Sequence, residues 1–116
     1  MARVTNAIVV LIACSSRAEA KRIAIVLVKM RLAACGNVVG ASATSIYRWK
    51  GNIQKAKEVL LILKSTRRVF PALEREVRRL HSYEVPEIIA LPIHTGSAQY
   101  LKWIEDCTSK VAKGKS

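Results

Sequence analysis

The residues in this sequence best suited to metal or nucleophilic chemistry are three cysteines and two histidines. Cys14, Cys35 and Cys107 are odd in number and include no C-x-x-C pair, so they indicate neither a closed set of disulfides nor a zinc ribbon. Cysteines without a disulfide framework are typical of proteins in a reducing cytoplasm, so we expect this location. Cys35 and His81 could form a nucleophile and its base, but nothing in their spacing brings them together. We therefore expect no complete catalytic set and no enzyme.

Charge and composition limit the partners of the chain. Its 116 residues include 20 Lys and Arg against 8 Asp and Glu, which gives a net charge of +12. Anionic partners such as phosphometabolites or nucleic acid are therefore worth testing. Hydrophobic residues make up 51% of the chain, slightly above the roughly 45–50% of soluble domains although the count omits glycine. We expect a single domain over residues 1–116 that keeps apolar surface for a partner subunit.

The N-terminal apolar run predicts the first strand. Residues 7–13 form a continuous run rich in β-branched side chains, typical of a strand covered on both faces or on one face and an interface. Leu11 to Cys14 also resembles a bacterial lipoprotein cleavage site with Arg3 as its charged flank, but the run is short for that role and a buried strand explains it better. No apolar run approaches the roughly 18 residues that span a bilayer, so we expect no membrane segment.

The next patterns predict a helix and a hairpin. Ser16 and Glu19 match an S-x-x-E capping box, which opens a helix that we expect to end near residues 35–36, with Met30 on its apolar side. Residues 38–49 and 53–64 are strand-like, and residues 50–52 between them supply a turn. These segments predict a long hairpin.

The C-terminal half again alternates helix and strand patterns. Apolar spacing predicts a second helix over residues 70–80, with Pro71 in its first turn, and then a short strand over residues 88–93 in which Pro92 lies at the end, at a bulge or on an edge. A last helix follows Gly96, and residues 109–116 form a polar basic tail. The order βαββαβ with an added C-terminal helix predicts a ferredoxin-like α+β fold.

Several motifs in this order resemble the CutA divalent-cation-tolerance family. They are Leu32-Ala-Ala-Cys35, Tyr47-Arg-Trp49-Lys-Gly51, residues 58–66, His81-Ser-Tyr83-Glu-Val-Pro86-Glu87 and Tyr100-Leu-Lys-Trp103, and they cover nearly the whole chain. The resemblance implies a homotrimer in which long hairpins extend onto neighbouring subunits and pair strands between chains. It places the trimer interface at the hairpin tip, with Tyr47, Trp49, Gly51 and Ile53. Exposed aromatic side chains at a hairpin tip are suited to such an interface.

The resemblance also implies a cleft between subunits. Its candidate residues are Lys64, Tyr83, Glu87, Tyr100 and Trp103. A lysine that ends a strand beside a tyrosine and a glutamate could hold a small anion or a cation. The alternative is structural, with an interface ion pair between Lys64 and Glu87 and aromatic packing around it.

Copper or another divalent cation is the ligand that the family name implies. Some members are thought to bind copper through a cysteine that ends the first strand and through adjacent histidines, but here Ile12 and Leu80 stand in those places. His81 remains as the metal candidate, supported at best by Cys14, and one imidazole does not make a tight site. We predict weak copper binding unless three His81 side chains converge on a trimer axis. The other role open to His81 is a partly cationic cap at the end of the second helix.

The function that follows is a homotrimeric binding or signalling scaffold in divalent-cation tolerance. The alternative is a binder of small anions, or of nucleic acid without sequence preference, that uses the basic surface. RNA-recognition domains share the predicted topology, but residues 58–63 lack the K/R-G-F/Y element and exposed aromatic pair of that class. We therefore expect no specific nucleic-acid site.

Overall fold

The structure, a computed structural model, describes residues 5–109, without the side chains of residues 41, 42 and 109. The elements in chain order are β1 (Ala7–Cys14), α1 (Arg17–Lys29), β2 (Cys35–Trp49), β3 (Asn52–Thr66), a 3-10 turn (Arg67–Val69), α2 (Phe70–Leu80), β4 (Ile88–Pro92) and α3 (Ala98–Ser109). The predicted order βαββαβ with a C-terminal helix is confirmed. From residue 110 on, the predicted basic tail lies outside the described residues. None of the helices in the described range is long and apolar enough to cross a membrane.

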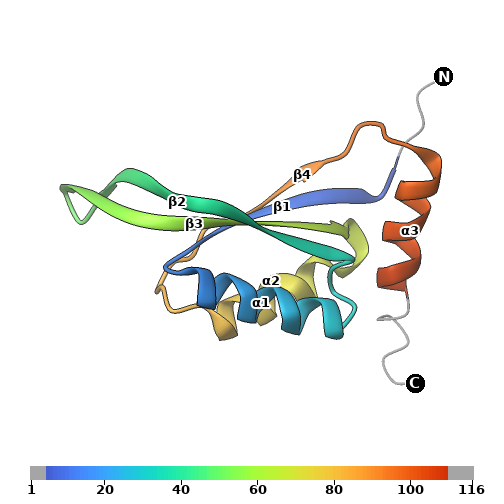
Figure 1. The fold of residues 1–116 in the computed structure, drawn as a ribbon, viewed down its shortest axis with the longest axis horizontal. Helices are drawn as coiled ribbons and strands as arrows, with labels where there is room; N and C mark the ends of the chain where they lie inside the picture. Colours follow the sequence, from blue (N-terminus) through green and yellow to red (C-terminus); the bar gives the residue numbers. More distant parts are fainter. Residues whose placement is uncertain (1–4, 110–116) are drawn as a thin grey trace.

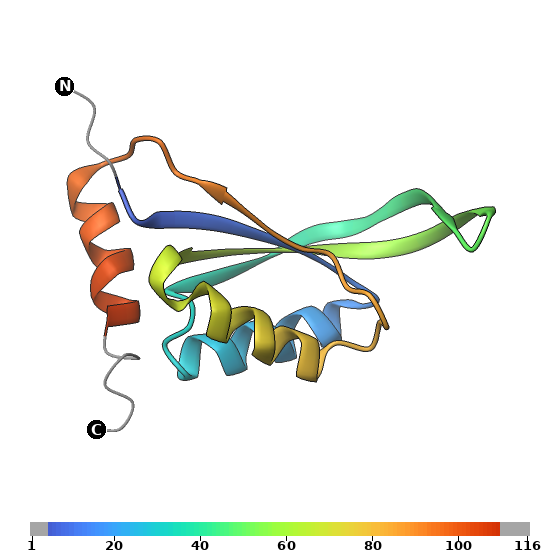
Figure 2. The same ribbon diagram turned by 180° about the vertical axis from the view of Figure 1, so that it is seen from behind.

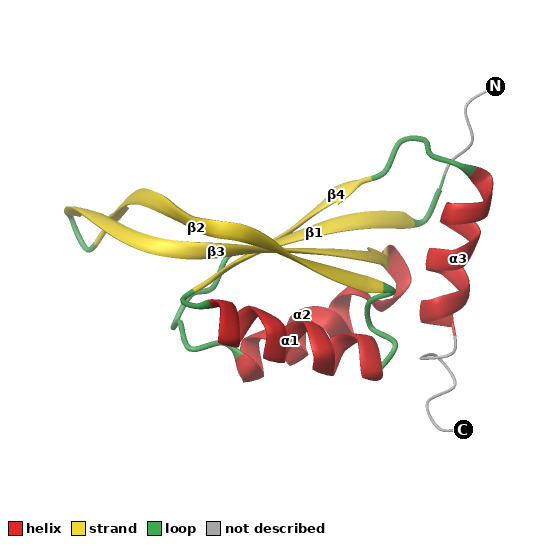
Figure 3. Cartoon of the chain, in the orientation of Figure 1, coloured by secondary structure: helices red, strands yellow, loops and turns green. Residues whose placement is uncertain are grey.

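The strands form one antiparallel sheet in the order β2-β3-β1-β4. Helices α1 and α2 lie side by side along one face, as Figure 1 and the reverse view in Figure 2 show. No described helix covers the opposite face. Helix α3 stands across the end of the sheet near the start of β1 (Figure 3). The chain therefore builds two layers, and one face of its sheet stays open.

The core lies between the sheet and helices α1 and α2. Alternate residues of β1 and β3 point toward the helices because side chains on a strand alternate between faces. The fully buried side chains include Val10, Ile12, Ile23, Leu27, Leu61, Leu63, Leu73 and Val77. A smaller cluster under α3 joins Ala7, Ala34 and Ile104. The amphipathic spacing that predicted α2 is confirmed, and Pro71 lies in its first turn, where no intrahelical N–H is needed.

Strands β2 and β3 continue beyond β1 as a projecting hairpin. β1 pairs with β3 only from Val59 to Thr66, so the segment Asn52–Glu58 pairs with β2 alone. Trp49 pairs with Asn52 across a two-residue loop. Both loop residues have positive φ, 50° at Lys50 and 83° at Gly51, as in the type I′ turn that matches strand twist. The predicted hairpin is confirmed, and its outer half has no strand partner on either side within the described chain.

Two expectations about α1 were wrong. The helix ends at Lys29 rather than near residues 35–36, because Arg31 adopts a left-handed φ of 60° and Leu32 then turns into the core. Met30 is consequently exposed instead of lying on the apolar side. The capping box is only half formed, since Ser16 accepts the Glu19 N–H at 3.1 Å while the Glu19 carboxylate binds Ser15 rather than returning to Ser16.

Candidate functional site

The open face of the sheet carries a continuous apolar surface. Strand register places side chains in rows across β4, β1, β3 and β2, and residues in one row share a face. The rows on this face are Leu91, Val9, Lys64 and Cys35; then Ile89, Leu11, Ile62 and Asn37; then Ala13, Leu60 and Val39. Apart from Lys64, Cys35 and Asn37, every member is apolar. This surface is the most conspicuous feature of the molecule that one chain leaves uncovered.

A cluster of polar and aromatic side chains lies at the α3 end of this face. Lys64 donates to Oδ1 of Asn37 at 2.7 Å, and the Cys35 sulfur lies 3.8 Å from the Tyr100 hydroxyl. Tyr100 and Trp103 contact each other with ring centroids 5.4 Å apart. The hydrogen bond with Cys35, followed by partial burial, raises the pKa of Tyr100, so this hydroxyl stays protonated and can serve as a donor.

A second cluster of side chains lies at the hairpin end of the sheet. The Tyr83 hydroxyl donates to Oε2 of Glu58 at 2.8 Å. Burial and this hydrogen bond raise the pKa of Tyr83. Residues 82–87 and the hairpin border an open cavity of about 830 Å³, which Glu87 also lines. Glu58 was not among the predicted site residues. Its place in the alternating pattern of β3, on the same face as Leu60, was the signal available in the sequence.

The five predicted cleft residues thus fall into two groups within one chain. Lys64, Tyr100 and Trp103 lie near α3, whereas Tyr83 and Glu87 lie near the hairpin base. Glu58 marks the second group on β3, six residues from Lys64, which corresponds to about 20 Å along a strand. Within the chain Lys64 donates to Asn37 and lies apart from Glu87. A cleft containing all five residues, as the resemblance implies, would have to join different subunits.

A buried cluster of Cys14, Glu19 and His81 lies beneath the end of β1. Their ligand atoms are all within 4.8 Å of one another. β1 stays regular through Cys14, so this thiol points to the same buried face as Ile12. His81 and Cys14 were the predicted metal candidates, and the structure brings them together. Glu19 was missed as a member because the capping box already accounted for it.

Each member of this cluster has a structural role in the fold. Burial, and then the nearby Glu19 charge, raise the pKa of the Cys14 thiol to about 12. Burial alone would raise the pKa of Glu19. Hydrogen bonds from Ser15 and Ser82 outweigh it and lower the pKa to about 2. In the His81 ring, Nδ1 accepts the Tyr83 N–H at 3.1 Å, and Nε2 lies 2.8 Å from the Ala13 carbonyl.

This donor set does not fit a copper or zinc ion. The Tyr83 N–H occupies the lone pair of His81 Nδ1, Nε2 lies against the Ala13 carbonyl, and the Cys14 thiol is fully buried, so a metal could bind only by displacing contacts of the fold. The His81 side chain is fully enclosed within one subunit, which argues against convergence of three rings on an axis. His81 lies at the C-cap of α2, as expected, and its backbone N–H donates to the Val77 carbonyl. Its ring Nδ1 also lies 3.7 Å from the Glu19 carboxylate.

The predicted interface residues lie on the projecting hairpin. Tyr47 and Trp49 are 43% and 38% exposed, and Ile53 is 60% exposed. Tyr47 and Trp49 line the hairpin side of the cavity, while Gly51 forms the turn beyond them. These side chains do not fold back into the core of their own chain.

Comparison with known proteins connects this architecture to one family. A family model described as CutA1 divalent ion tolerance protein matches residues 8–107. The divalent-cation tolerance protein CutA of Thermus thermophilus is 49% identical over 100 residues, covering 86% of this chain and 96% of that protein. Human protein CutA is 44% identical over 101 residues, and there the chain spans only 56% of the relative's length.

Solved structures agree with this match in three dimensions. The Thermus thermophilus Cut A1 structure superposes with a TM-score of 0.85 at 48% identity, covering 88% of this chain and 98% of that one. CutA from Xylella fastidiosa gives a TM-score of 0.86 at 33% identity, covering 90% and 99%. The sheet, the covered face and the long hairpin are therefore shared features, and the chain belongs to the CutA1 divalent ion tolerance family.

Proposed function

We propose that this chain is a ferredoxin-like, homotrimeric binding or signalling scaffold for divalent-cation tolerance, and that it is not an enzyme. The observation that carries the proposal is the uncovered apolar face of the sheet, which adjoins a hairpin with an unpaired edge. An isolated chain would leave Val39, Ile89 and Leu91 each more than 40% exposed beside half-buried Leu11 and Ile62. Contiguous exposed apolar surfaces of this kind mark sites of contact with partners.

Strand pairing between subunits would complete the same surface. The β1-side edge of residues 52–58 on β3 and the outer edges of β2 and β4 have no neighbouring strand within the described chain. Unpaired edges promote uncontrolled association unless they are covered or closed. A closed ring of three subunits, each contributing its hairpin to the next, satisfies these edges and covers the open face.

A non-enzymatic role follows from the chemistry of the described residues. Cys35 contacts Tyr100, while His81 is enclosed near Ala13, so this predicted nucleophile and base lie apart. Cys14 does lie close to His81, but both residues are buried away from any substrate. The cysteines are free, which supports our proposal of a reducing, cytoplasmic location. A homologue from Archaeoglobus fulgidus is described as periplasmic and plant relatives as chloroplastic, so the compartment should be tested by fractionation of cells expressing the tagged full chain.

The role in cation tolerance does not require a tight metal site in each subunit. In the cluster of Cys14, Glu19 and His81, hydrogen bonds of the fold occupy the carboxylate and the imidazole, and the thiol is fully buried. We propose that tolerance works through a regulated interaction of the scaffold, with weak direct copper binding. The second candidate, a small-anion site at Lys64, rests on one lysine that already binds Asn37.

Light scattering in dilute solution tests the assembly. We expect a mass of about three times 12.8 kDa that stays constant on dilution through the micromolar range, because obligate interfaces of this apolar kind are tight. A stable monomer would contradict the proposal. Metal tolerance itself can be tested by deleting the gene and measuring growth against copper, with complementation by the wild-type chain and by a monomeric variant.

A further inference from the structure

The outer side of helix α1 carries exposed aliphatic side chains. Ile25 lies two residues from both the buried Ile23 and the buried Leu27, so it is on the opposite side of the helix and points away from the sheet. It is 55% exposed, and Val28, nearly one turn further along, is 40% exposed. One exposed aliphatic side chain is ordinary on a protein surface, but these two together form an apolar strip that a partner can cover.

Cations flank this apolar strip. Lys21 and Arg22 lie one turn before Ile25, because residues three or four apart are neighbours on a helix surface. Lys29 lies one turn after Ile25 by the same rule. Helix α2 lies beside α1 (Figure 1), and its exposed Arg75 is on the side opposite its buried residues. We define the outer helical face as Lys21, Arg22, Ile25, Val28, Lys29 and Arg75.

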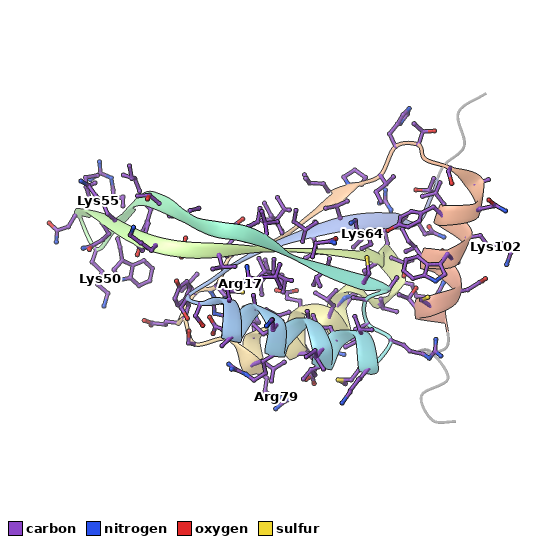
Figure 4. All side chains as sticks on the ribbon, viewed as in Figure 1. Arg17, Lys50, Lys55, Lys64, Arg79 and Lys102 are labelled. Atoms are coloured by element: carbon purple, nitrogen blue, oxygen red, sulfur yellow. The ribbon has the colours of Figure 1, made fainter. Side chains whose placement is uncertain are left out.

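The positive charge of the outer helical face is not compensated within the described part of the chain. Glu19, the one acidic residue of α1, is buried. The two glutamates of α2 form ion pairs, Glu74 with Arg78 and Glu76 with Arg79. Figure 4 shows Arg79 on the side of the helices that faces away from the sheet. The cations of the outer helical face form no ion pair among the described residues, so this face attracts a negatively charged partner.

The outer helical face stays accessible in the proposed trimer. That assembly uses the open face of the sheet, which is the side opposite α1 and α2. It also uses the hairpin, which projects beyond the two helices at one end of the molecule (Figures 1 and 2). Docking through the outer helical face therefore does not compete with association of the subunits.

The combination of charge and apolar side chains favours a membrane surface as the partner. A small anion would pair with the cations but would leave the apolar strip in water. A partner protein helix usually lies in an apolar groove, whereas Ile25 stands on the most exposed line of α1. Lys and Arg can reach lipid phosphates while their methylene stems remain against apolar surface. An aliphatic side chain between such cations is placed to enter the layer below the headgroups.

We propose that the outer helical face docks on membranes that contain anionic lipids. Ile25 and Val28 insert below the headgroups, while the neighbouring cations pair with the lipid phosphates and carboxylates. The contact is peripheral and reversible, since it relies on surface side chains and leaves the fold intact. The cytoplasmic leaflet carries anionic lipids, so the proposed cytoplasmic location would supply this surface. Membrane docking goes beyond the proposed scaffold role, because it uses a face that the trimer does not.

Co-sedimentation of the full chain with lipid vesicles at physiological salt tests this proposal. The vesicles contain equal parts phosphatidylcholine and phosphatidylserine, and vesicles of phosphatidylcholine alone are the neutral reference. The charge variant is Lys21→Gln/Lys29→Gln. Its matched control, Lys55→Gln/Lys102→Gln, removes the same charge from the hairpin tip and from α3, where Figure 4 shows these two lysines. The charge variant should bind anionic vesicles at least about tenfold more weakly than the wild type, and the control should change little.

A third variant, Ile25→Ser/Val28→Ser, keeps every charge and removes the apolar strip. Because it loses the inserted side chains, it should bind anionic vesicles at least about fivefold more weakly than the wild type. Light scattering of each variant should still give the mass of the wild type, since the outer helical face lies outside the proposed interface. A loss of binding can then be assigned to the outer helical face and not to a change in assembly.

Four outcomes would overturn the proposal. The first is no sedimentation of the wild type with anionic vesicles, which would leave an acidic protein as the partner of this face. The second is equal sedimentation with neutral vesicles. The third is an equal loss in the charge variant and its control, which would show only the general attraction of a basic chain to anions. The fourth is unchanged binding of Ile25→Ser/Val28→Ser, which would show that nothing is inserted. A trimer that ignores the vesicles removes only the docking, whereas a monomer that binds them removes only the trimer.

Discussion

Oε2 of Glu19 accepts a 2.8 Å hydrogen bond from the backbone N–H of Ser82, a residue 63 positions further along the chain. Oε1 of the same carboxylate accepts both the N–H and the hydroxyl of Ser15. One buried side chain therefore joins the loop after β1 to the loop after α2. The second loop carries Tyr83 and Glu87, so Glu19 positions the wall of the cavity without touching its interior.

Replacing this carboxylate should make stability depend less on pH. Glu19 has a pKa of about 2 in the fold against 4.5 for an ordinary glutamate. Its contribution, on the order of 3 kcal/mol, is therefore present above pH 4.5 and is lost as the pH falls toward 2. Urea unfolding of Glu19→Gln and wild type should differ most at neutral pH and converge in acid. The variant Glu74→Gln, at a half-exposed carboxylate on α2, should shift little at any pH, and a constant gap for Glu19→Gln would contradict the assignment.

His81→Ala should weaken the fold rather than remove a copper site. The change leaves the Tyr83 N–H and the Ala13 carbonyl without their ring partner, which costs about 1–3 kcal/mol for each buried group left unpaired. Thermal unfolding should show this loss. Copper(II) titrated into the wild type should give no saturable one-per-subunit isotherm. One tight copper per trimer that His81→Ala abolishes would contradict both statements.

Trp49→Ala should weaken association of the subunits. Trp49 is exposed on the hairpin of a single chain, so truncation removes little from the core, but an aromatic anchor at an interface contributes about 2 kcal/mol or more. Analytical ultracentrifugation over a dilution series should show earlier dissociation of the variant. Lys21→Ala, an exposed change on the helical layer, is the control. Unchanged dissociation of the Trp49 variant would remove this residue from the interface.

Gly51→Ala should destabilise the hairpin through its backbone alone. Gly51 has a φ of 83°, and a methyl group added there meets nothing within 4 Å, so the expected cost of about 1 kcal/mol comes from the left-handed conformation. Gly40 also has open space around it but no positive φ. Gly40→Ala should therefore be neutral or slightly stabilising in urea unfolding. Equal losses in the two variants would show that packing, and not conformation, governs the turn.

The sequence by itself determined the order of elements, the hairpin and the family. These features depend on local patterns, such as the run in β1, the spacing in α2 and the Lys50-Gly51 turn, and each pattern has a short-range physical cause. The end of α1 was predicted too late because apolar residues continue past Lys29. Nothing in the periodicity reveals that Arg31 adopts a left-handed conformation there.

Only the tertiary structure decided which chemical groups meet. It separated Lys64 from Glu87 along the sheet, and it joined Cys14, Glu19 and His81 from three elements into a buried cluster. Such contacts depend on strand register and on how the loops cross the end of β1, which no local pattern encodes. The sequence contains the donors of a metal site, but the fold has already used the Glu19 carboxylate and the His81 ring in its own hydrogen bonds.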